Sequence, residues 1–446
     1  MKTLTPLEPW IKTKIGLPAT EPMTRTILED YQFGKLRETI EHARRHSPFY
    51  RRHLEGCVDP VSLAELARLP FTFPADLQAD DLRFLCVSRG EIERIVTLAS
   101  SGTTAPAKRL HFTGDDLELT VDFFRHGMST LVEPGERVLI LMPGELHGSV
   151  GDLLVKGLAR MDVEGIVRWP VGDAEEVIAE IAERRITSMV GLPGQVLALV
   201  RHPAASLLPN GQIRSVLLSA DYVPDALVRE IGRVWGSPVF NHYGMTEMGL
   251  GGGVDCRALT GYHLREADLY FEIVDPIDGR PLPDGLSGEV VFTTLTRRGM
   301  PLIRYRTGDL ARFIPGPCPC GSMLRRLGHV RGRLSGRVNI GDGSWLDCAD
   351  LDEALYPLPC LIDYQAELIE EEGRDTLALT LHMCNIDEHA TSVMLRNALE
   401  QIPAVRNALA AGDFVLGEIR FRGKNRPATG VAKKTIIDRR NGGTRQ

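Results

Sequence analysis

The sequence predicts an α/β protein with mostly parallel sheets in a large N-terminal part, followed by a smaller α+β part. First, short and nearly continuous apolar runs alternate with amphipathic stretches, which is typical of parallel strands covered by helices on both faces. Second, the residue pattern changes near residue 268, where segments such as GEVVFTTL are separated by tight turns and favour antiparallel strands. Third, a Gly-rich and polar stretch over 332–343 predicts a hinge before the C-terminal part.

In chain order, the first expected element is a helix over 24–55, where apolar residues recur at helical spacing and Pro48 interrupts the pattern. A Pro-rich loop follows from Leu69. The segment 173–185 is amphipathic and predicts a helix of the α/β part. Beyond the hinge we expect a new set of strands and one helix, over 390–402. The apolar runs predicted as strands before residue 268 are 92–99, 137–143, 165–170, 187–193, 213–220 and 237–244.

The composition bounds the class of protein. The 446 residues suffice for two or three domains. Hydrophobic residues make up 43% of the chain and charged residues 25%, and this composition excludes disorder for the bulk of the chain. A net charge of −7 argues against a nucleic-acid partner held by a basic surface. No apolar run approaches the roughly 20 residues of a membrane span, and the N-terminal segment lacks the apolar core of a signal peptide. Eight cysteines in such a chain predict the reducing cytoplasm, with thiols that are buried, catalytic or metal-bound.

The first motif that carries chemistry is LASSGTTAPAKR (98–109). It places hydroxyl side chains around a glycine after a predicted strand, and such a loop can surround a phosphate with N–H and O–H donors. Lys108 would add a positive charge. The alternative is a solvated Ser/Thr loop. The chain contains neither GxxxxGK[ST] nor a GxGxxG that opens a helix, so this is not a P-loop.

The second motif is NHYGMTEMG (241–249), at the end of a predicted strand, where α/β sheets bind ligands. Glu247 is a hard oxygen ligand suited to Mg²⁺ on a nucleotide. Thr246 can hydrogen-bond a phosphate, and Tyr243 offers a flat face for a base. An ordinary strand–turn–helix junction is the alternative.

The third motif is RYRTGDLARF (304–313). We expect Asp309 in a turn after an apolar strand, where its carboxylate can accept hydrogen bonds from two ribose hydroxyls. The alternative is an Asp that only stabilises its own turn.

In this order, the three motifs resemble the adenylate-forming superfamily of acyl-CoA synthetases, adenylation domains and luciferases. Their spacing is most similar to the phenylacetate-CoA ligase branch, as are HSPFYRRHL (46–54) and LPFTFPADL (69–77). The resemblance runs from about residue 24 to 340 and more weakly to the end. It implies that ATP activates a carboxylic acid, an aryl or arylacetic acid, to an acyl-adenylate. A thiol, usually that of coenzyme A, then takes the acyl group.

The resemblance also implies an organisation and a set of site residues. An AMP-binding domain would cover 1–332, a mobile lid would cover 333–446, and a homodimer is compatible with the family. Asp309 would hold the ribose, assisted by Arg333. The adenine, phosphate and Mg²⁺ motif would consist of Tyr243, Gly244, Thr246 and Glu247. The phosphate loop would consist of Ser100, Ser101, Gly102, Thr103, Thr104 and Lys108.

The sequence departs from the family pattern at several positions. Ala105 stands where a glycine is usual, and Ser335 stands near the usual hinge aspartate. The family also carries a C-terminal lysine that bridges the carboxylate and the phosphate. Lys433 is the best candidate for it, although matching from IIDRR places Ala432 at that position. Lys434, Lys424 and a purely solvated basic tail are the alternatives.

Cys318 and Cys320 are separated by one residue and can share a soft metal ion, but a tetrahedral structural zinc needs four ligands. Cys256 and His263 would complete a Cys₃His set, and some phenylacetate-CoA ligase relatives look similar here and carry a structural zinc. The alternatives are four unconnected residues, or a redox pair of Cys318 and Cys320.

The acyl pocket is harder to locate. His147 and Tyr222 are candidate substrate contacts, with ordinary surface or core roles as the alternative. The leading hypothesis for function is an ATP-, Mg²⁺- and CoA-dependent acid–thiol ligase. Two alternatives stay open, namely adenylation with a carrier-protein or protein thiol as acceptor, and a non-catalytic nucleotide-binding relative.

Overall fold

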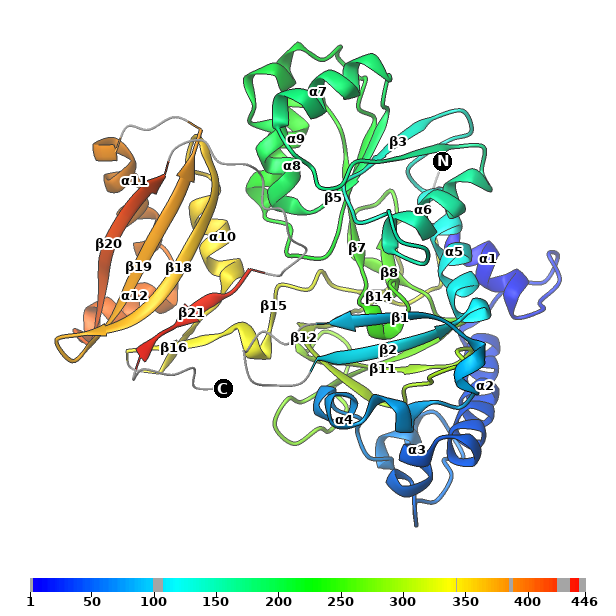
Figure 1. The fold of residues 1–446 in the computed structure, drawn as a ribbon. Coiled ribbons are helices and arrows are strands. Elements are labelled where there is room, and N and C mark those ends of the chain that lie inside the picture. The colour runs from blue at the N-terminus through cyan, green and yellow to red at the C-terminus, as the bar shows by residue number, and fades with distance from the viewer. Residues whose placement is uncertain (1–2, 99–106, 342, 385–387, 423–433, 441–446) are drawn as a thin grey trace. The chain divides into compact units, whose positions relative to one another are not determined.

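A computed structural model describes residues 3–98, 107–341, 343–384, 388–422 and 434–440 (Figure 1). The chain divides into two compact units, each built from several segments. The first unit consists of Met1–Gly135, Pro143–Gly165 and Phe240–Val330. The second unit consists of Glu136–Met142, Ile166–Val239 and Arg331–Gln446. The mixed α/β class that the sequence predicts is confirmed.

The helix expected over 24–55 is present as two helices that break at Pro48. The Thr24 hydroxyl accepts a hydrogen bond from the Ile27 N–H and starts the first of them, and the Ser47 hydroxyl accepts from the Tyr50 N–H and starts the second. A short helix near the N-terminus was not expected from the sequence. The helices of the first unit are α1 Leu7–Lys14, α2 Arg25–His46, α3 Pro48–His53, α4 Pro74–Ala79, α5 Gly114–Met128 and α6 Val150–Ala159.

The first unit contains three sets of antiparallel strands. The first set is the pair β1 Ile92–Leu98 and β2 Lys108–Thr113, and the second set is β10 Leu269–Val274, β11 Gly288–Thr294 and β12 Tyr305–Ala311. The third set is β7 Val239–Tyr243, β8 Gly253–Asp255, β9 Tyr262–Leu264, β14 Arg326–Leu327 and β13 Phe313–Ile314. The antiparallel strands expected beyond residue 268 are therefore confirmed. The run 92–99 forms a hairpin and not a parallel strand, because too few residues separate it from β2 for a crossover connection.

The second unit holds the parallel strands that the sequence predicts. Strands β3, β5 and β6 are parallel neighbours in that order, and β5 and β6 are buried along their whole length. Apolar residues of the adjacent helices, such as Ile178, Ile181 and Ile231, complete this core. The elements are β3 Arg137–Ile140, β4 Glu164–Val167, α7 Ala174–Glu183, β5 Ser188–Gly191, α8 Pro193–Val200, β6 Ser215–Leu218 and α9 Asp225–Trp235.

Residues 331–446, also in the second unit, form a four-stranded sheet in the order β20-β19-β18-β21, with helices packed beside it (Figure 1). The described part of this region has three helices, so the expectation of one helix was wrong. The missed helices are short, and one begins at an Asp347 cap and the other at Pro403. The elements are β15 Gly332–Arg333, β16 Val338–Ile340, β17 Ser344–Leu346, α10 Cys348–Leu355, β18 Leu361–Glu371, β19 Arg374–Met383, α11 Glu388–Glu400, α12 Pro403–Ala411, β20 Phe414–Arg422 and β21 Ile436–Asp438.

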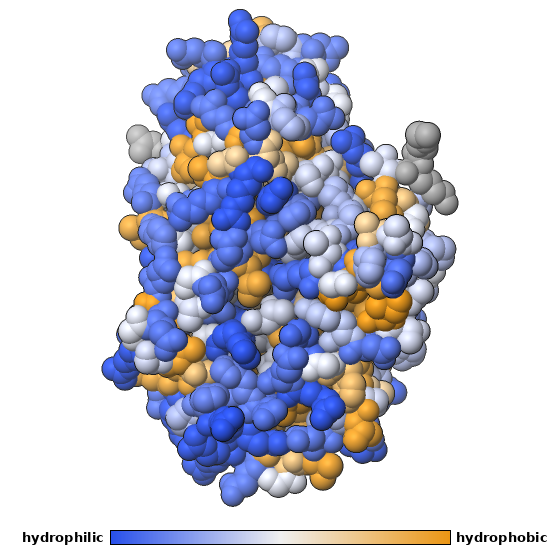
Figure 2. Space-filling model, turned by 90° about the vertical axis from the view of Figure 1, so that its right-hand side faces the viewer, coloured by the Kyte–Doolittle hydropathy of each residue, from blue (hydrophilic) through white to orange (hydrophobic). Residues whose placement is uncertain are grey.

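The surface drawn in Figure 2 is mostly hydrophilic, with apolar side chains in separate small groups. Among the described residues, no helix is both long and apolar enough to cross a membrane.

Candidate nucleotide and metal sites

The turn after β7 presents the second motif. Gly244 follows the last residue of this strand, and a Cβ there would overlap the carbonyl oxygen of Leu250, so the tight turn requires glycine. The next residues form a single 3-10 turn, Thr246–Met248, which carries Glu247 inward. The buried guanidinium of Arg297 donates hydrogen bonds to the carbonyl oxygens of Glu247 (2.8 Å) and His111 (3.0 Å). Arg297 thereby holds the turn against β2.

Glu247 lies in a compact polar group with Lys108 and Tyr305, which we call the nucleotide cluster. The Lys108 ammonium contacts the Glu247 carboxylate directly. The Tyr305 hydroxyl accepts a hydrogen bond from Lys108 at 3.2 Å and donates one to the same carboxylate oxygen at 3.0 Å. Glu247 is only 2% exposed, so its negative charge needs this nearby positive charge.

Asp309 lies within β12, one residue after its middle residue Gly308, and not in a turn, which corrects the expectation from the sequence. A bulge explains the difference, because Glu289 pairs with Leu310 but Val291 pairs with Arg306 in the facing strand. Gly308 within the bulge has a φ of +75°. The Tyr243 hydroxyl donates a hydrogen bond to the buried Asp309 carboxylate at 3.0 Å.

The ring of Tyr243 stacks on that of Tyr262, with centroids 5.7 Å apart and an interplanar angle of 29°. Tyr243 is buried, so one ring face is already covered by protein. The Tyr262 ring in turn contacts His329, which lies 2.9 Å from the fully buried carboxylate of Asp255. This row of side chains links the motif to the strand that precedes Cys256.

The structure therefore brings Lys108, Glu247, Tyr243 and Asp309 into two hydrogen-bonded groups of the first unit. Thr246 lies in the same turn as Glu247 and is partly exposed. Arg333 lies on β15, which belongs to the second unit. The remaining predicted residues, Ser100, Ser101, Gly102, Thr103, Thr104 and Lys433, lie outside the described part of the chain.

Sequence reasoning missed Tyr305 and Arg297. Tyr305 stands within the third motif, four residues before Asp309, so the motif itself contained a signal that pointed to it. No local pattern marks Arg297, whose role depends on its burial behind the turn.

Lys434, an alternative for the catalytic lysine, contacts other residues of the C-terminal part of the chain. Its ammonium lies 3.0 Å from Asp363 and 3.4 Å from Asp352, contacts the Tyr356 hydroxyl, and faces the ring of Tyr364 at 4.2 Å. Burial alone would lower the pKa of Lys434, but the surrounding acidic groups raise it well above its ordinary value. A lysine enclosed in this way stays charged and serves as an anchor.

The candidate substrate contacts have other partners in this structure. His147 is exposed, and its Nε2 lies 3.4 Å from the Glu93 carboxylate. The Tyr222 hydroxyl donates a hydrogen bond to Glu353 at 2.7 Å. These contacts agree with the surface and core roles considered as alternatives.

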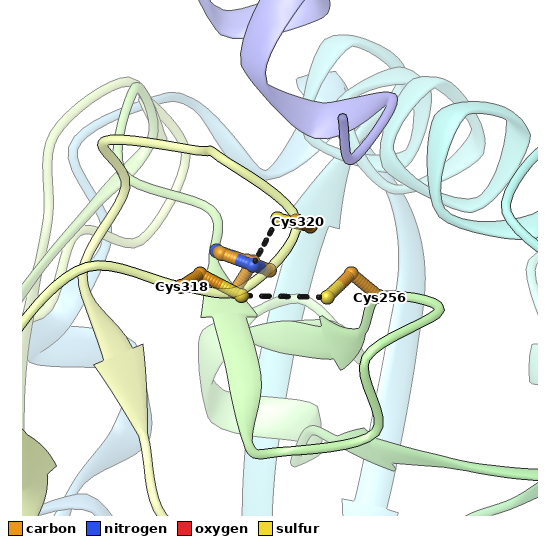
Figure 3. A group of neighbouring side chains, drawn as sticks. Cys256, Cys318 and Cys320 are labelled. Atoms are coloured by element: carbon orange, nitrogen blue, oxygen red, sulfur yellow. Dashed lines mark hydrogen bonds between the residues drawn. The ribbon is translucent and has the colours of Figure 1, made fainter. Parts of the chain in front are cut away.

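The four expected metal ligands converge in the first unit, and we call them the cysteine cluster (Figure 3). The sulfurs of Cys256 and Cys318 are 3.6 Å apart, and the Cys320 sulfur is 3.4 Å from His263 Nε2. All four donor atoms lie within 4.8 Å of one another. Ligands about 2.3 Å from a tetrahedral zinc stand at similar mutual separations, so the set fits this ion in number, type and spacing.

Burial decides how these ligands ionise without a metal. Burial raises the pKa of the Cys256 thiol to about 12 and raises that of Cys320 as well. Burial lowers the pKa of His263 to about 4, which keeps the imidazole neutral and its lone pair available. His263 Nδ1 is buried without a hydrogen-bond partner among the described residues. The ring makes its polar contact through Nε2, with the sulfur of Cys320.

Comparison with known proteins places the chain in the class of AMP-forming acid–thiol ligases. A model of the AMP-binding enzyme family matches residues 95–295. The chain is 30% identical over 380 residues to the phenylacetate-coenzyme A ligase of Thermus thermophilus, covering 80% of this chain and 81% of that protein. It is likewise 30% identical over 385 residues to the enzyme of the same name from Escherichia coli K12, covering 83% and 86%.

Solved structures agree about the fold. A 2-hydroxyisobutyryl-CoA ligase in its postadenylation state superimposes with a TM-score of 0.78 at 20% identity, covering 95% of this chain and 94% of that one. The chain belongs to the phenylacetate-CoA ligase family of adenylate-forming enzymes, which confirms the resemblance seen in the three motifs. Enzymes of this class ligate an acid to a thiol at the expense of ATP, through an acyl-adenylate.

Proposed function

We propose that this chain activates an aryl or arylacetic acid with ATP and transfers the acyl group to coenzyme A. Similarity to two phenylacetate-coenzyme A ligases over four fifths of the chain supports the acid and the acceptor. The observation that carries the proposal is the nucleotide cluster, in which a charged lysine and a carboxylate are held by the family motifs beside a buried aspartate.

The proposed reaction has two steps. A carboxylate oxygen of the acid attacks the α-phosphorus of ATP, and the bond to the β-phosphate oxygen breaks to release pyrophosphate. The thiol of coenzyme A, after losing its proton, then attacks the acyl carbonyl, and AMP leaves. Most of the catalysis of both steps is positioning and charge neutralisation.

The described residues have defined parts in this scheme. Asp309 accepts hydrogen bonds from the ribose hydroxyls, and Tyr243 fixes the orientation of this carboxylate through its hydroxyl. Lys108 turns toward the phosphates when the nucleotide enters, since an ammonium can exchange one anionic partner for another. Tyr305 contacts both Lys108 and Glu247 and keeps the carboxylate hydrogen-bonded during this exchange.

Glu247 is the residue that would hold Mg²⁺, because its carboxylate offers the hard oxygen that this ion prefers. When bound, Mg²⁺ neutralises charge on the phosphates. The phosphate loop around Ser100–Thr104, the ribose contact of Arg333 and the lid over 333–446 remain proposals from the family resemblance. Lys433 is proposed as the lysine that bridges acid and phosphate, and the enclosed position of Lys434 supports it over its neighbour.

We also propose that the cysteine cluster binds one structural Zn²⁺. Three thiols and one neutral imidazole supply four soft or borderline ligands, and a closed set of four is typical of structural zinc. Inductively coupled plasma mass spectrometry should find about one zinc per chain. Cys318→Ser should lose it and Cys57→Ser, outside the cluster, should retain it. A wild-type chain without zinc contradicts this part of the proposal.

The function is tested by carboxylate-dependent ATP–pyrophosphate exchange across aryl, arylacetic and short-chain acids, followed by thioester formation with coenzyme A. Exchange and thioester formation with an arylacetic or aryl acid are expected. Exchange without a CoA thioester would show that another thiol is the acceptor. The absence of exchange with every acid would support a non-catalytic nucleotide-binding protein.

Two further expectations complete the proposal. All eight cysteines are free thiols, which supports the cytoplasm as the working compartment. The homodimer stays a prediction, and light scattering after size-exclusion chromatography would measure it.

A further inference from the structure

Helix α1 lies against the loop that carries Cys318 and Cys320. We infer that this N-terminal helix is the outer wall of the metal site, so that metal binding and the docking of α1 stabilise each other. The inference rests on the proposed zinc site and adds Glu8 and Thr5 as residues that position a ligand.

The first contact comes from the side chain of Glu8. One oxygen of this carboxylate accepts hydrogen bonds from the Ser322 hydroxyl at 2.5 Å and from the Met323 N–H at 2.8 Å. The Ser322 hydroxyl in turn accepts from the Leu324 N–H at 3.1 Å. Ser322 is only 3% exposed and Glu8 is half-buried, and these charge-assisted bonds fix the turn directly after Cys320.

The second contact reaches the ligand itself. Burial raises the pKa of the Cys320 thiol, and the backbone N–H groups of Ser322 and Thr5 partly oppose this by lowering it. Thr5 is buried at the start of α1, two residues before the first helical residue. N–H donors of this kind stabilise the negative charge of a metal-bound thiolate and fix its direction. The orientation of the proposed metal ligand Cys320 therefore depends on a segment more than 300 residues away in the sequence.

The far side of α1 is attached to parts of the first unit that contain no metal ligand. The Trp10 indole donates a hydrogen bond to Asp122 at 2.8 Å and stacks on His126. Lys14 forms an ion pair with Asp268 at 2.6 Å. Leu7 and Ile11 are fully buried. The helix thus joins α5 and the turn before β10 to the metal loop.

The length of α1 explains why the coupling runs in both directions. A helix of eight residues is not stable alone in water, so α1 exists because it is docked. Without metal, the loop over 318–324 loses its attachment to Cys256 and His263, and the partner of Glu8 loses its fixed position. Metal bound at one side then favours the docked helix, and the docked helix favours bound metal by the same factor.

The first test measures zinc release to an excess of a coloured chelator. Glu8→Gln should release zinc about tenfold faster than wild type and Glu8→Ala up to about a hundredfold faster, the usual range for residues that orient metal ligands. Glu21→Gln, in the exposed segment after α1, is the matched control and should release zinc at the wild-type rate. Equal rates for all three variants would overturn the inference.

The second test needs no substitution. The Lys14 side chain is 18% exposed and paired with Asp268, so trypsin should cleave after Lys14 slowly in the zinc-loaded protein. Removing zinc with the chelator should accelerate this cleavage at least tenfold, and adding zinc back should restore protection. Cleavage after Arg233, which is exposed on α9 in the second unit, gives the internal reference.

The outcomes separate the two proposals. A wild-type chain that holds no metal overturns both the zinc site and the coupling. A chain that holds one zinc, yet is cleaved after Lys14 at the same rate with and without it, overturns the coupling alone.

Discussion

The nucleotide cluster and the cysteine cluster are both buried in the first unit, but they balance charge in opposite ways. In the nucleotide cluster, the Glu247 carboxylate already has a cation, Lys108, and a hydroxyl, Tyr305. In the cysteine cluster, the four side chains are three thiols and one neutral imidazole, and none of the four carries a positive charge. The first cluster already pairs its negative charge with a cation, whereas the second keeps the Cys256 and Cys320 thiols protonated and neutral until the proposed metal displaces their protons.

This difference matches two kinds of site, one that exchanges its ligand and one that keeps it. The proposed nucleotide site must bind and release its ligand in each turnover, and an internal counter-ion benefits such a site because the buried carboxylate is never left unpaired. A structural site has no release step, so it can keep its ligands protonated and inert until a metal displaces the protons. Four predictions test this contrast, from the largest expected effect to the smallest.

Acidification should release the metal from the cysteine cluster. Because burial raises the pKa of Cys256 to about 12 and that of Cys320 in the metal-free protein, each must lose a proton when metal binds. Metal affinity should therefore fall about tenfold per pH unit for each of these thiols, which makes roughly ten-thousandfold between pH 7 and pH 5.

Competition with a chelator at pH 5, 6 and 7 measures this slope. The imidazole of His263, whose pKa is lowered to about 4 by burial, stays neutral over the range and should add little. A slope below one proton per metal would contradict the prediction.

Glu247→Gln tests the nucleotide cluster. It leaves the Lys108 ammonium without its counter-ion and removes the proposed Mg²⁺ ligand, so adenylation should fall by about 10²- to 10³-fold. ATP–pyrophosphate exchange measures the loss. Glu118→Gln removes a carboxylate from an exposed pair with Arg160 and should change exchange by less than twofold. Comparable losses in both variants would argue that Glu247 has no special part.

Asp309→Asn tests the buried carboxylate beside the cluster. The amide keeps one oxygen that can accept from Tyr243 but loses the charge, and a hydrogen bond to a charged group contributes about 1.5–3 kcal/mol. The KM for ATP should rise by about 10- to 100-fold in steady-state assays, with a smaller change in kcat. Asp284→Asn, which alters an exposed pair with Arg325, should leave the KM unchanged.

Tyr305→Phe should have the smallest effect. The change removes one hydroxyl that links Lys108 and Glu247 but leaves their direct contact, so we expect a loss of about 1 kcal/mol, or roughly fivefold, in exchange. Tyr270→Phe on β10, two strands away in the same sheet, is the control. A loss as large as that of Glu247→Gln would mean that the hydroxyl itself takes part in the chemistry.

Much of the candidate site could be predicted from the sequence, because its residues stand in short motifs. Glu247 is buried directly after a strand, as the YGMTE segment indicates, and Tyr243 reaches Asp309 across 66 residues. The conformation of Asp309 could not be predicted, since the bulge around Gly308 depends on how β12 pairs with β11. Helix α1 escaped prediction because eight residues give little periodicity, and its stability comes from docking.

The sequence by itself determined the family, the order of the motifs and the identity of the four candidate metal ligands, because these depend on residue type and local spacing. Only the tertiary structure decided that Cys256 and His263 meet Cys318 and Cys320, and that Glu8 binds the turn after Cys320. It also decided that Tyr305 and Arg297 hold Glu247. The physical reason is that these contacts join residues far apart in the chain, so strand register and burial, and not local pattern, set their distances.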